Sequence, residues 1–188
     1  LGRAVGNALE VDEARDTIRG DGPADFTALV LEASAQLLAH SDLGIDLAEG
    51  RRRAEAAVDD GSALETYERW IRAQGGDPDP SVLEQAPIQT YVAAPREGVV
   101  TRVSALAVGN AALELGAGRT TKTDDVDHAV GIRCFAKRGD TVLAGDDLAE
   151  VHARDEGAAR RAAAAVLAAY EIGDDAAADH GILLDVVG

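Results

Sequence analysis

Aromatic residues, cysteine and long apolar runs are all scarce in this sequence. Aromatic side chains make up only 3% of the residues, so the core must be built mainly from Ala, Val and Leu. A single cysteine, Cys134, excludes an intrachain disulfide, and its place in the apolar run 130–136 is typical of a small buried residue. No apolar run approaches the length needed to cross a bilayer, and the first residues lack the apolar region of a signal peptide. The sequence therefore predicts a cytoplasmic protein that makes no membrane contact.

Positive charge is scarce as well. Lys and Arg total 18 against 34 Asp and Glu, which gives a formal net charge of −16. A surface of this sign repels phosphate polymers and anionic lipids, so nucleic-acid binding is disfavoured. A hydrophobic content of 46% is that of a globular protein, and 188 residues suit one large domain or two small ones.

Residues 1–85 carry the apolar spacing of helices. Asn7 can cap the first helix, and Trp70 lies on the apolar side of the last one, which predicts a core position. In chain order, the helices are expected at residues 7–19, from 23 onward, at 47–58 and at 62–74.

The pattern changes after the turn-rich segment 75–87. Beyond it, strands are expected at residues 88–94, 98–103, 130–136, 148–152 and 182–187, and helices at 105–115, capped by Ser104, and at 155–170. The predicted class is α+β, with a helical domain over residues 1–85 and an α+β domain over residues 86–188.

Two stretches carry a family resemblance. They are LGRAVGNALEVDEARDTIRGDGPAD, residues 1–25, and AAPREGVVTRVSALAVGNAALELGAGRTTKTDDVDHAVGIRCFAKRGDTVLAGDDLAEVHA, residues 93–153. In this order and separation they resemble the pyrimidine-nucleoside phosphorylases of the thymidine phosphorylase type. The resemblance implies that residues 1–85 are the C-terminal part of a large α/β domain. It also implies that residues 86–188 form a small α+β domain with a β-sandwich or hammerhead-like sheet.

The activity that the resemblance implies is a pentosyl transfer. Members of the family cleave a pyrimidine nucleoside with phosphate, releasing the base and a pentose 1-phosphate, and they work as homodimers. Their phosphate loop and their Arg/Ser/Lys/His cluster lie upstream of the matched stretches, so no catalytic residue carries over to this chain. We therefore expect the chain to be the C-terminal portion of such an enzyme and to be inactive alone.

A cation site is the first candidate site. The resemblance implies a potassium ion held by the backbone carbonyls of Leu1 and Ala4 and by the carboxylate of Glu13. Oxygen ligands with one negative charge suit a hard monovalent cation. The alternative is that Glu13 is a solvated helix residue.

The second candidate is the glycine-rich segment with Gly116, Gly118 and Arg119. It follows a predicted helix, so the helix dipole has the wrong sign for a phosphate cradle. The resemblance implies instead a loop that closes over the substrates as a lid. A simple helix C-terminus with left-handed glycines is compatible with the same residues.

Two other functions stay open. Residues 96–103 and 137–153 are similar to the sandwich halves of biotinyl and lipoyl carrier domains, but neither Lys122 nor Lys137 lies in a carrier-type hairpin motif. A related phosphorylase that acts on nucleoside monophosphates is also compatible with the matched segments. No zinc site is indicated, because the four histidines lack ligand spacing and are expected to be surface or ordinary structural residues; they are His40, His128, His152 and His180.

Overall fold

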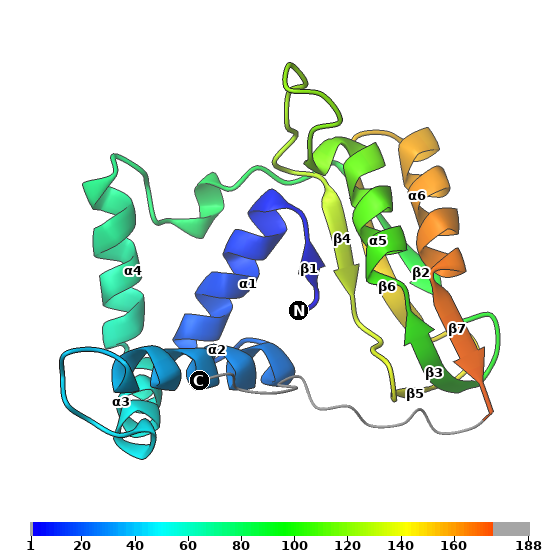
Figure 1. Cartoon of the computed structure of the whole chain (residues 1–188). Coiled ribbons are helices and arrows are strands. Elements are labelled where there is room, and N and C mark those ends of the chain that lie inside the picture. The colour runs from blue at the N-terminus through cyan, green and yellow to red at the C-terminus, as the bar shows by residue number, and fades with distance from the viewer. Residues whose placement is uncertain (1, 175–188) are drawn as a thin grey trace. The chain divides into compact units, whose positions relative to one another are not determined.

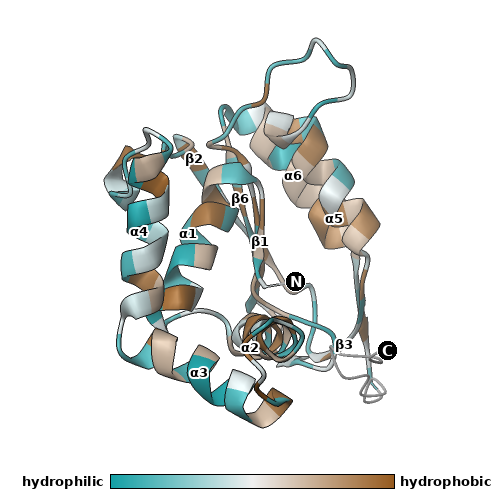
Figure 2. Cartoon of the chain, turned by 60° about the vertical axis from the view of Figure 1, so that its left-hand side comes forward, coloured by the Kyte–Doolittle hydropathy of each residue, from teal (hydrophilic) through white to brown (hydrophobic). Residues whose placement is uncertain are grey.

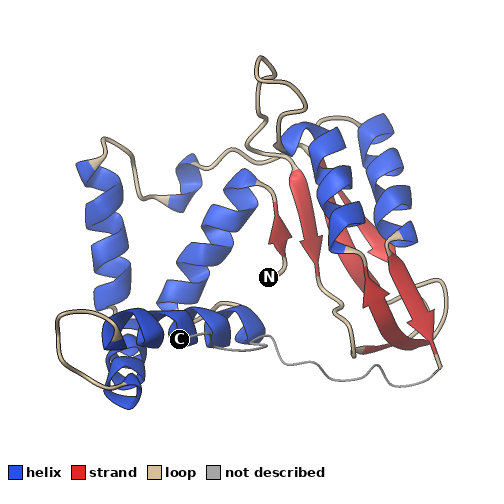
Figure 3. Ribbon diagram, viewed as in Figure 1, coloured by secondary structure: helices blue, strands red, loops and turns tan. Residues whose placement is uncertain are grey.

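The computed structural model describes residues 2–174, which divide into two compact units. Unit 1 contains Gly2 and Asp12–Val82, and unit 2 contains Arg3–Val11 and residues 83–174. Over the described residues, six α-helices accompany two antiparallel sheets (Figures 1 and 3). The predicted α+β class is confirmed. The boundary between residues 85 and 86 stays a prediction, and the strand expected at 182–187 lies outside the described residues.

The helices of unit 1 follow the predicted order. They are α1 (Asn7–Arg19), which starts in unit 2, α2 (Ala24–Ala39), α3 (Leu47–Asp59) and α4 (Ser62–Ala73), followed by the short turn η1 (Pro80–Val82). Asp46 caps α3 by accepting a hydrogen bond from the amide of Glu49 at 2.8 Å. Gly50 lets α3 approach α2 closely, since a side-chain carbon there would lie 2.7 Å from the carbonyl oxygen of Ala35.

Unit 1 buries little apolar surface. Among its described residues, Ala35 is the only fully buried hydrophobic one, and Figure 2 shows α2 as a mostly hydrophobic helix. The predicted core position of Trp70 is wrong, because 57% of this residue is exposed. Its ring lies beside Tyr67, with the ring centres 6.3 Å apart, so Trp70 forms a surface aromatic pair instead.

Unit 2 is built on two sheets. The four-stranded sheet has the order β1 (Ala4–Val5), β4 (Gly131–Cys134), β6 (Asp147–Ala153) and β2 (Ile88–Ala93). The three-stranded sheet has the order β5 (Thr141–Val142), β3 (Gly98–Val103) and β7 (Tyr170–Gly173). The sequence analysis missed β1, β5 and β7, of which the first two are only two residues long.

Two helices of unit 2 pack together, and α6 covers β2 and β6 (Figure 1). These are α5 (Ala105–Ala112), capped by Ser104, and α6 (Glu156–Ala168), capped by Asp155. The core lies beneath them, and its largest fully buried side chains are Ile132, Leu148, Val100, Val130, Val151 and Val166. Across the described residues, no helix is both long and apolar enough to span a membrane.

Candidate functional site

The glycine-rich segment forms the start of a long loop between α5 and β4 (Figure 1). After α5 the chain continues as a π-helical turn, Leu113–Ala117, in which Gly116 has a φ of 104°. This left-handed value favours glycine and ends the helix. Gly118 is extended, and a side-chain carbon there would lie 2.9 Å from Cδ1 of Leu113. Gly116 and Gly118 therefore make a narrow turn where the loop leaves the helix.

The outer part of the loop is held by its own hydrogen bonds. Asp124 accepts from the backbone amides of Thr120 and Thr121 at 3.0 and 2.8 Å, and from both of their hydroxyl groups. These bonds, with the Thr120 side chain as the largest influence, hold the pKa of the Asp124 carboxyl well below its usual range. Nε of Arg119 donates to the carbonyl oxygen of Asp124 at 3.1 Å. The predicted lid residue Arg119 thus belongs to a compact turn.

The base of the loop is clamped by ion pairs. Arg154 makes two hydrogen bonds to the carboxylate of Asp127, at 2.6 and 2.8 Å, and an ion pair with Glu84 at 2.7 Å. The guanidinium of Arg154 lowers the pKa of Asp127. The amide of Asp127 also donates to the carbonyl oxygen of Gly116 at 2.9 Å, which closes the loop where it leaves α5. The sequence analysis missed this clamp.

The N-terminal resemblance segment contacts the same loop within unit 2. Nδ2 of Asn7 donates to the carbonyl of Ala117 at 2.8 Å, and the amide of Ala8 donates to the carbonyl of His128 at 3.0 Å. The predicted capping role of Asn7 is therefore wrong, because its side chain bonds to the loop. At the start of α1 it is Glu10 that accepts a hydrogen bond, from the amide of Gly6 at 2.9 Å. The two stretches that carry the resemblance meet at the two ends of one loop.

The predicted cation ligands are placed individually. Glu13 lies on α1 with its carboxylate directly against Gly2, because a side-chain carbon on Gly2 would lie 2.0 Å from Oε2. Ala4 is in β1, opposite Arg133 of β4, and Leu1 lies outside the described residues. Over residues 2–174 no group of three or more His, Cys, Asp and Glu side chains could hold a metal ion. The predicted potassium site consists of two backbone carbonyls and one carboxylate, so a search for groups of such side chains does not test it. The potassium site therefore stays a prediction.

A buried polar pair lies on β6. Glu150 and His152 are two residues apart in a strand, so they face the same side, and Nε2 of His152 lies 2.9 Å from Oε2 of Glu150. Both residues are buried, which agrees with a structural histidine. The hydrogen bond to Glu150 raises the pKa of the exposed Tyr91 phenol on the neighbouring strand. Glu150 and His152 are therefore hydrogen-bond partners for each other, as is usual for buried polar side chains in folded proteins.

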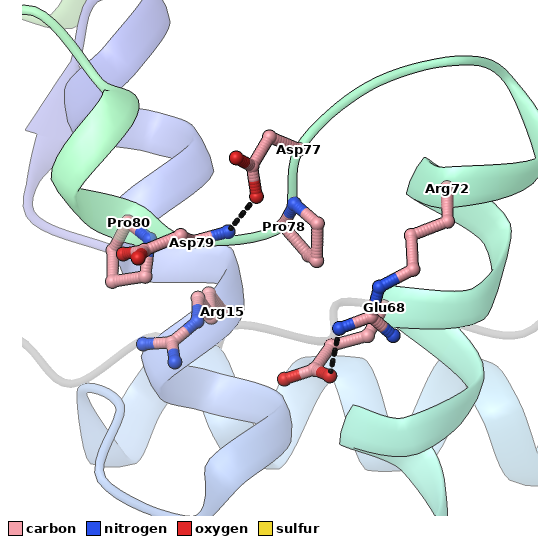
Figure 4. A pocket seen from close by; sticks show the side chains of 7 residues that line it. All are labelled: Arg15, Glu68, Arg72, Asp77, Pro78, Asp79 and Pro80. Carbon is pink, nitrogen blue, oxygen red and sulfur yellow. Dashed lines mark hydrogen bonds and ion pairs between the residues drawn. The ribbon is translucent and has the colours of Figure 1, made fainter.

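Unit 1 contains a separate pocket of about 460 Å³ (Figure 4). Glu68 pairs with Arg72 at 3.0 Å, and Asp77 accepts from the amide of Asp79 at 3.0 Å. Nε of Arg15 is buried without a hydrogen-bond partner among the described residues. Three carboxylates face two guanidinium groups in this lining, so the pocket is not a dedicated anion site. The sequence analysis gave no signal for it, since its residues come from three separate segments.

Comparison with known proteins identifies the family. The model described as "Pyrimidine nucleoside phosphorylase C-terminal domain" matches residues 99–173, which include the loop. The chain is 43% identical over 160 residues to the pyrimidine-nucleoside phosphorylase of Geobacillus stearothermophilus. These aligned residues make up 83% of this chain and 37% of that protein. The Bacillus subtilis enzyme of the same name is 44% identical over 160 residues, with the same shares covered.

An enzyme of that name from Staphylococcus aureus strain RF122 is 44% identical over 156 residues, which are 81% of this chain and 36% of that protein. The chain therefore spans little more than a third of the length of the curated relatives it matches. The matches include both the helical residues and the sheets, since they extend well beyond residues 99–173. The chain belongs to the pyrimidine nucleoside phosphorylase family, and it carries that family's C-terminal domain.

Proposed function

We propose that this chain is part of a pyrimidine-nucleoside phosphorylase, a pentosyltransferase that cleaves a pyrimidine nucleoside with phosphate. The observation that carries the proposal is the identity of 43–44% to enzymes of that name across 83% of the chain. Phosphate attacks the anomeric carbon of the nucleoside, the glycosidic bond breaks, and the base leaves with the bonding electrons. Such a reaction needs an in-line phosphate and stabilisation of the leaving base.

The role of this chain in the reaction is to position and cover the substrates. The residues that would bind phosphate and base are implied by the resemblance to lie upstream of the matched segments, so none is assigned here. Residues 116–127 would serve as a lid, because they form a preformed loop on a clamped base. Glu13, with carbonyls of the segment around Ala4, would contribute to a potassium site. Homodimerisation, thymidine as a substrate and a cytoplasmic location are further parts of this proposal.

Two measurements test the proposed function. The purified chain, incubated with thymidine and phosphate, should release no thymine above a blank. A chimaera, in which the aligned region of this chain replaces the corresponding 37% of the G. stearothermophilus enzyme, should restore phosphorolysis. Thymine release by the chain alone would overturn the division of roles. A folded chimaera without activity would count against the function itself.

The related nucleoside-monophosphate phosphorylase remains the alternative within the same chemistry. Nucleoside and nucleoside monophosphate, offered in turn to the chimaera, report on the substrate preference that the aligned region permits. The comparisons give no support to the carrier-domain alternative, because the proteins that this chain matches are phosphorylases.

A further inference from the structure

Helix α2 packs against a neighbour through one side only. Among the described elements, α3 is the only one that packs extensively on α2, where Gly50 comes close to Ala35. Ala35 is also the only residue of α2 that is fully buried. Phe26 lies nine residues before Ala35, which is about two and a half helical turns, so it projects from the opposite side of the helix.

That opposite side carries a continuous apolar stripe. Five residues at helical spacing form it, and we call them the α2 stripe: Phe26, Leu29, Val30, Ala33 and Leu37. Ala33 and Leu37 are exposed, and the other three are only partly buried. The exposed fraction of Leu37 is 74%, which is unusual for a large hydrophobic residue in the middle of an apolar stripe.

The charged side chains of α2 lie on the side that faces α3. Its two charged residues, Asp25 and Glu32, are ten and three residues before Ala35, so both project from the same half of the helix as Ala35. Glu32 forms an ion pair with Arg51 of α3 at 3.7 Å, which agrees with this placement. A surface helix normally turns its charged side to water and its apolar side to the core. Because α2 does the reverse, its stripe is suited to contact another apolar surface.

Unit 1 has no core of its own that could bury the stripe. In its described part, Ala35 is the only fully buried hydrophobic residue, whereas a domain is normally built from layers that enclose a core. The relatives contain the additional chain that such a core needs. The aligned residues make up 37% of the G. stearothermophilus enzyme, so nearly two thirds of that protein lies outside the alignment.

We propose that the α2 stripe is the surface on which the remaining part of a phosphorylase packs, through an uncharged apolar surface of its own. This inference rests on the proposed function, because that remaining part would carry the residues that bind phosphate and base. A second copy of this chain is a poorer partner, since two molecules with a net charge of −16 repel each other. In this arrangement α2 joins the described helices to the part of the enzyme that performs the reaction.

Cysteine labelling measures directly whether the stripe is covered. Leu37→Cys is introduced into the chain and into a chimaera that carries α2 from this chain. Modification of the introduced thiol by a water-soluble reagent is then followed by mass spectrometry of the peptide that contains residue 37. We expect rapid modification in the chain, where Leu37 is largely exposed. In the folded chimaera it should be at least about tenfold slower, because a covered thiol reacts only when the structure opens.

Leu106→Cys is the matched control. Leu106 lies in the helix α5 of unit 2 and is 75% exposed, so its substitution should react at similar rates in both proteins. Equal rates for Leu37→Cys in the chain and in the folded chimaera would overturn the inference. Protection in the chain alone would also overturn it. If that protection rises with protein concentration, a second copy covers the stripe; if it is lost when residues 175–188 are removed, those residues cover it.

Thermal unfolding gives a second measurement that does not depend on activity. Leu37→Asp should lower the melting temperature of the chimaera by at least about 5 °C, because it places a charge in an apolar contact. In the chain alone it should change the melting temperature by less than about 2 °C, as is usual for a surface substitution. Equal shifts in the two proteins would contradict the inference. A folded chimaera that protects residue 37 but releases no thymine would sink the proposed function alone, and an active chimaera without protection would sink this inference alone.

Discussion

Replacing Tyr170 with phenylalanine removes a single oxygen atom from the core of unit 2. The hydroxyl group of this buried residue is shared between the carbonyl oxygens of Ala136 and Leu148, each at 3.0 Å. The Leu148 carbonyl keeps two other donors, the amides of Phe135 at 2.8 Å and Ala136 at 3.1 Å. Both carbonyls lose the hydroxyl donor, but the Leu148 carbonyl still accepts from these two amides. We therefore expect Tyr170→Phe to lower the free energy of unfolding by about 1–2 kcal/mol.

The same hydroxyl should make stability depend on alkaline pH. Burial is the main cause that raises the pKa of Tyr170 far above its ordinary value. In the unfolded chain the phenol ionises near pH ~10. The stabilisation is therefore complete below that pH and is lost as pH rises above it, by about 1.4 kcal/mol per pH unit. Tyr170→Phe lacks this loss, so the difference between parent and variant should shrink above pH ~10.

Urea unfolding followed by circular dichroism at several pH values measures both effects. Burial also raises the pKa of the neighbouring Cys134 thiol, so the comparison is best made in a Cys134→Ala background. Trp70, the only tryptophan, lies in unit 1, and its fluorescence therefore reports on that unit separately. If the variant is as stable as the parent at neutral pH, or if the difference is the same at alkaline pH, the reasoning about the buried hydroxyl is refuted.

Three further predictions concern packing, the clamp and the cation. Leu148→Ala should destabilise unit 2 by about 2–5 kcal/mol in urea unfolding, because the side chain is fully buried. Arg154→Gln removes the ion pairs at the base of the loop, so hydrogen exchange in the loop should become faster, and this increase should be smaller at high salt. The control variant Arg160→Gln, in α6, should leave hydrogen exchange in the loop unchanged. In the chimaera, Glu13→Gln should lower thermal stability and activity, and high potassium should restore both better than sodium. Identical melting curves with and without potassium would leave Glu13 a solvated helix residue.

Apart from the eight-residue α5, the helices were predictable from sequence because each is long enough to repeat an apolar pattern over three or more turns. The strand at β3 was predicted at its observed bounds, 98–103. By contrast, β1 and β5 are two residues long, which is too short for any alternation to be read. Tyr170 was assigned to the end of a helix, whereas it begins β7, because pairing with β3 outweighs the local helical preference.

The candidate site was predictable only in part. The glycines and Arg119 stand out locally, since a helix that ends in a glycine-rich segment is visible in sequence. Arg154 carries no such signal: it lies 27 residues from Asp127, and only folding brings the two together. Asp124 lies within four residues of its partners, yet an aspartate after two threonines is common in ordinary turns. The pattern could not show that one carboxylate accepts all four hydrogen bonds.

The two-residue strand β1 also determines what an isolated sheet of this protein would expose. β1 pairs with the edge of β4, where the amide of Cys134 donates to the carbonyl of Arg3 at 2.7 Å. A polypeptide that began at residue 83 would keep the other strands but would leave this edge of β4 unpaired. Unpaired edges are templates for strand addition from another molecule, so such a polypeptide should self-associate. The nine residues at the start of unit 2, Arg3–Val11, thus protect this sheet from aggregation. The remaining strands of the sheet begin only some eighty residues later in the chain.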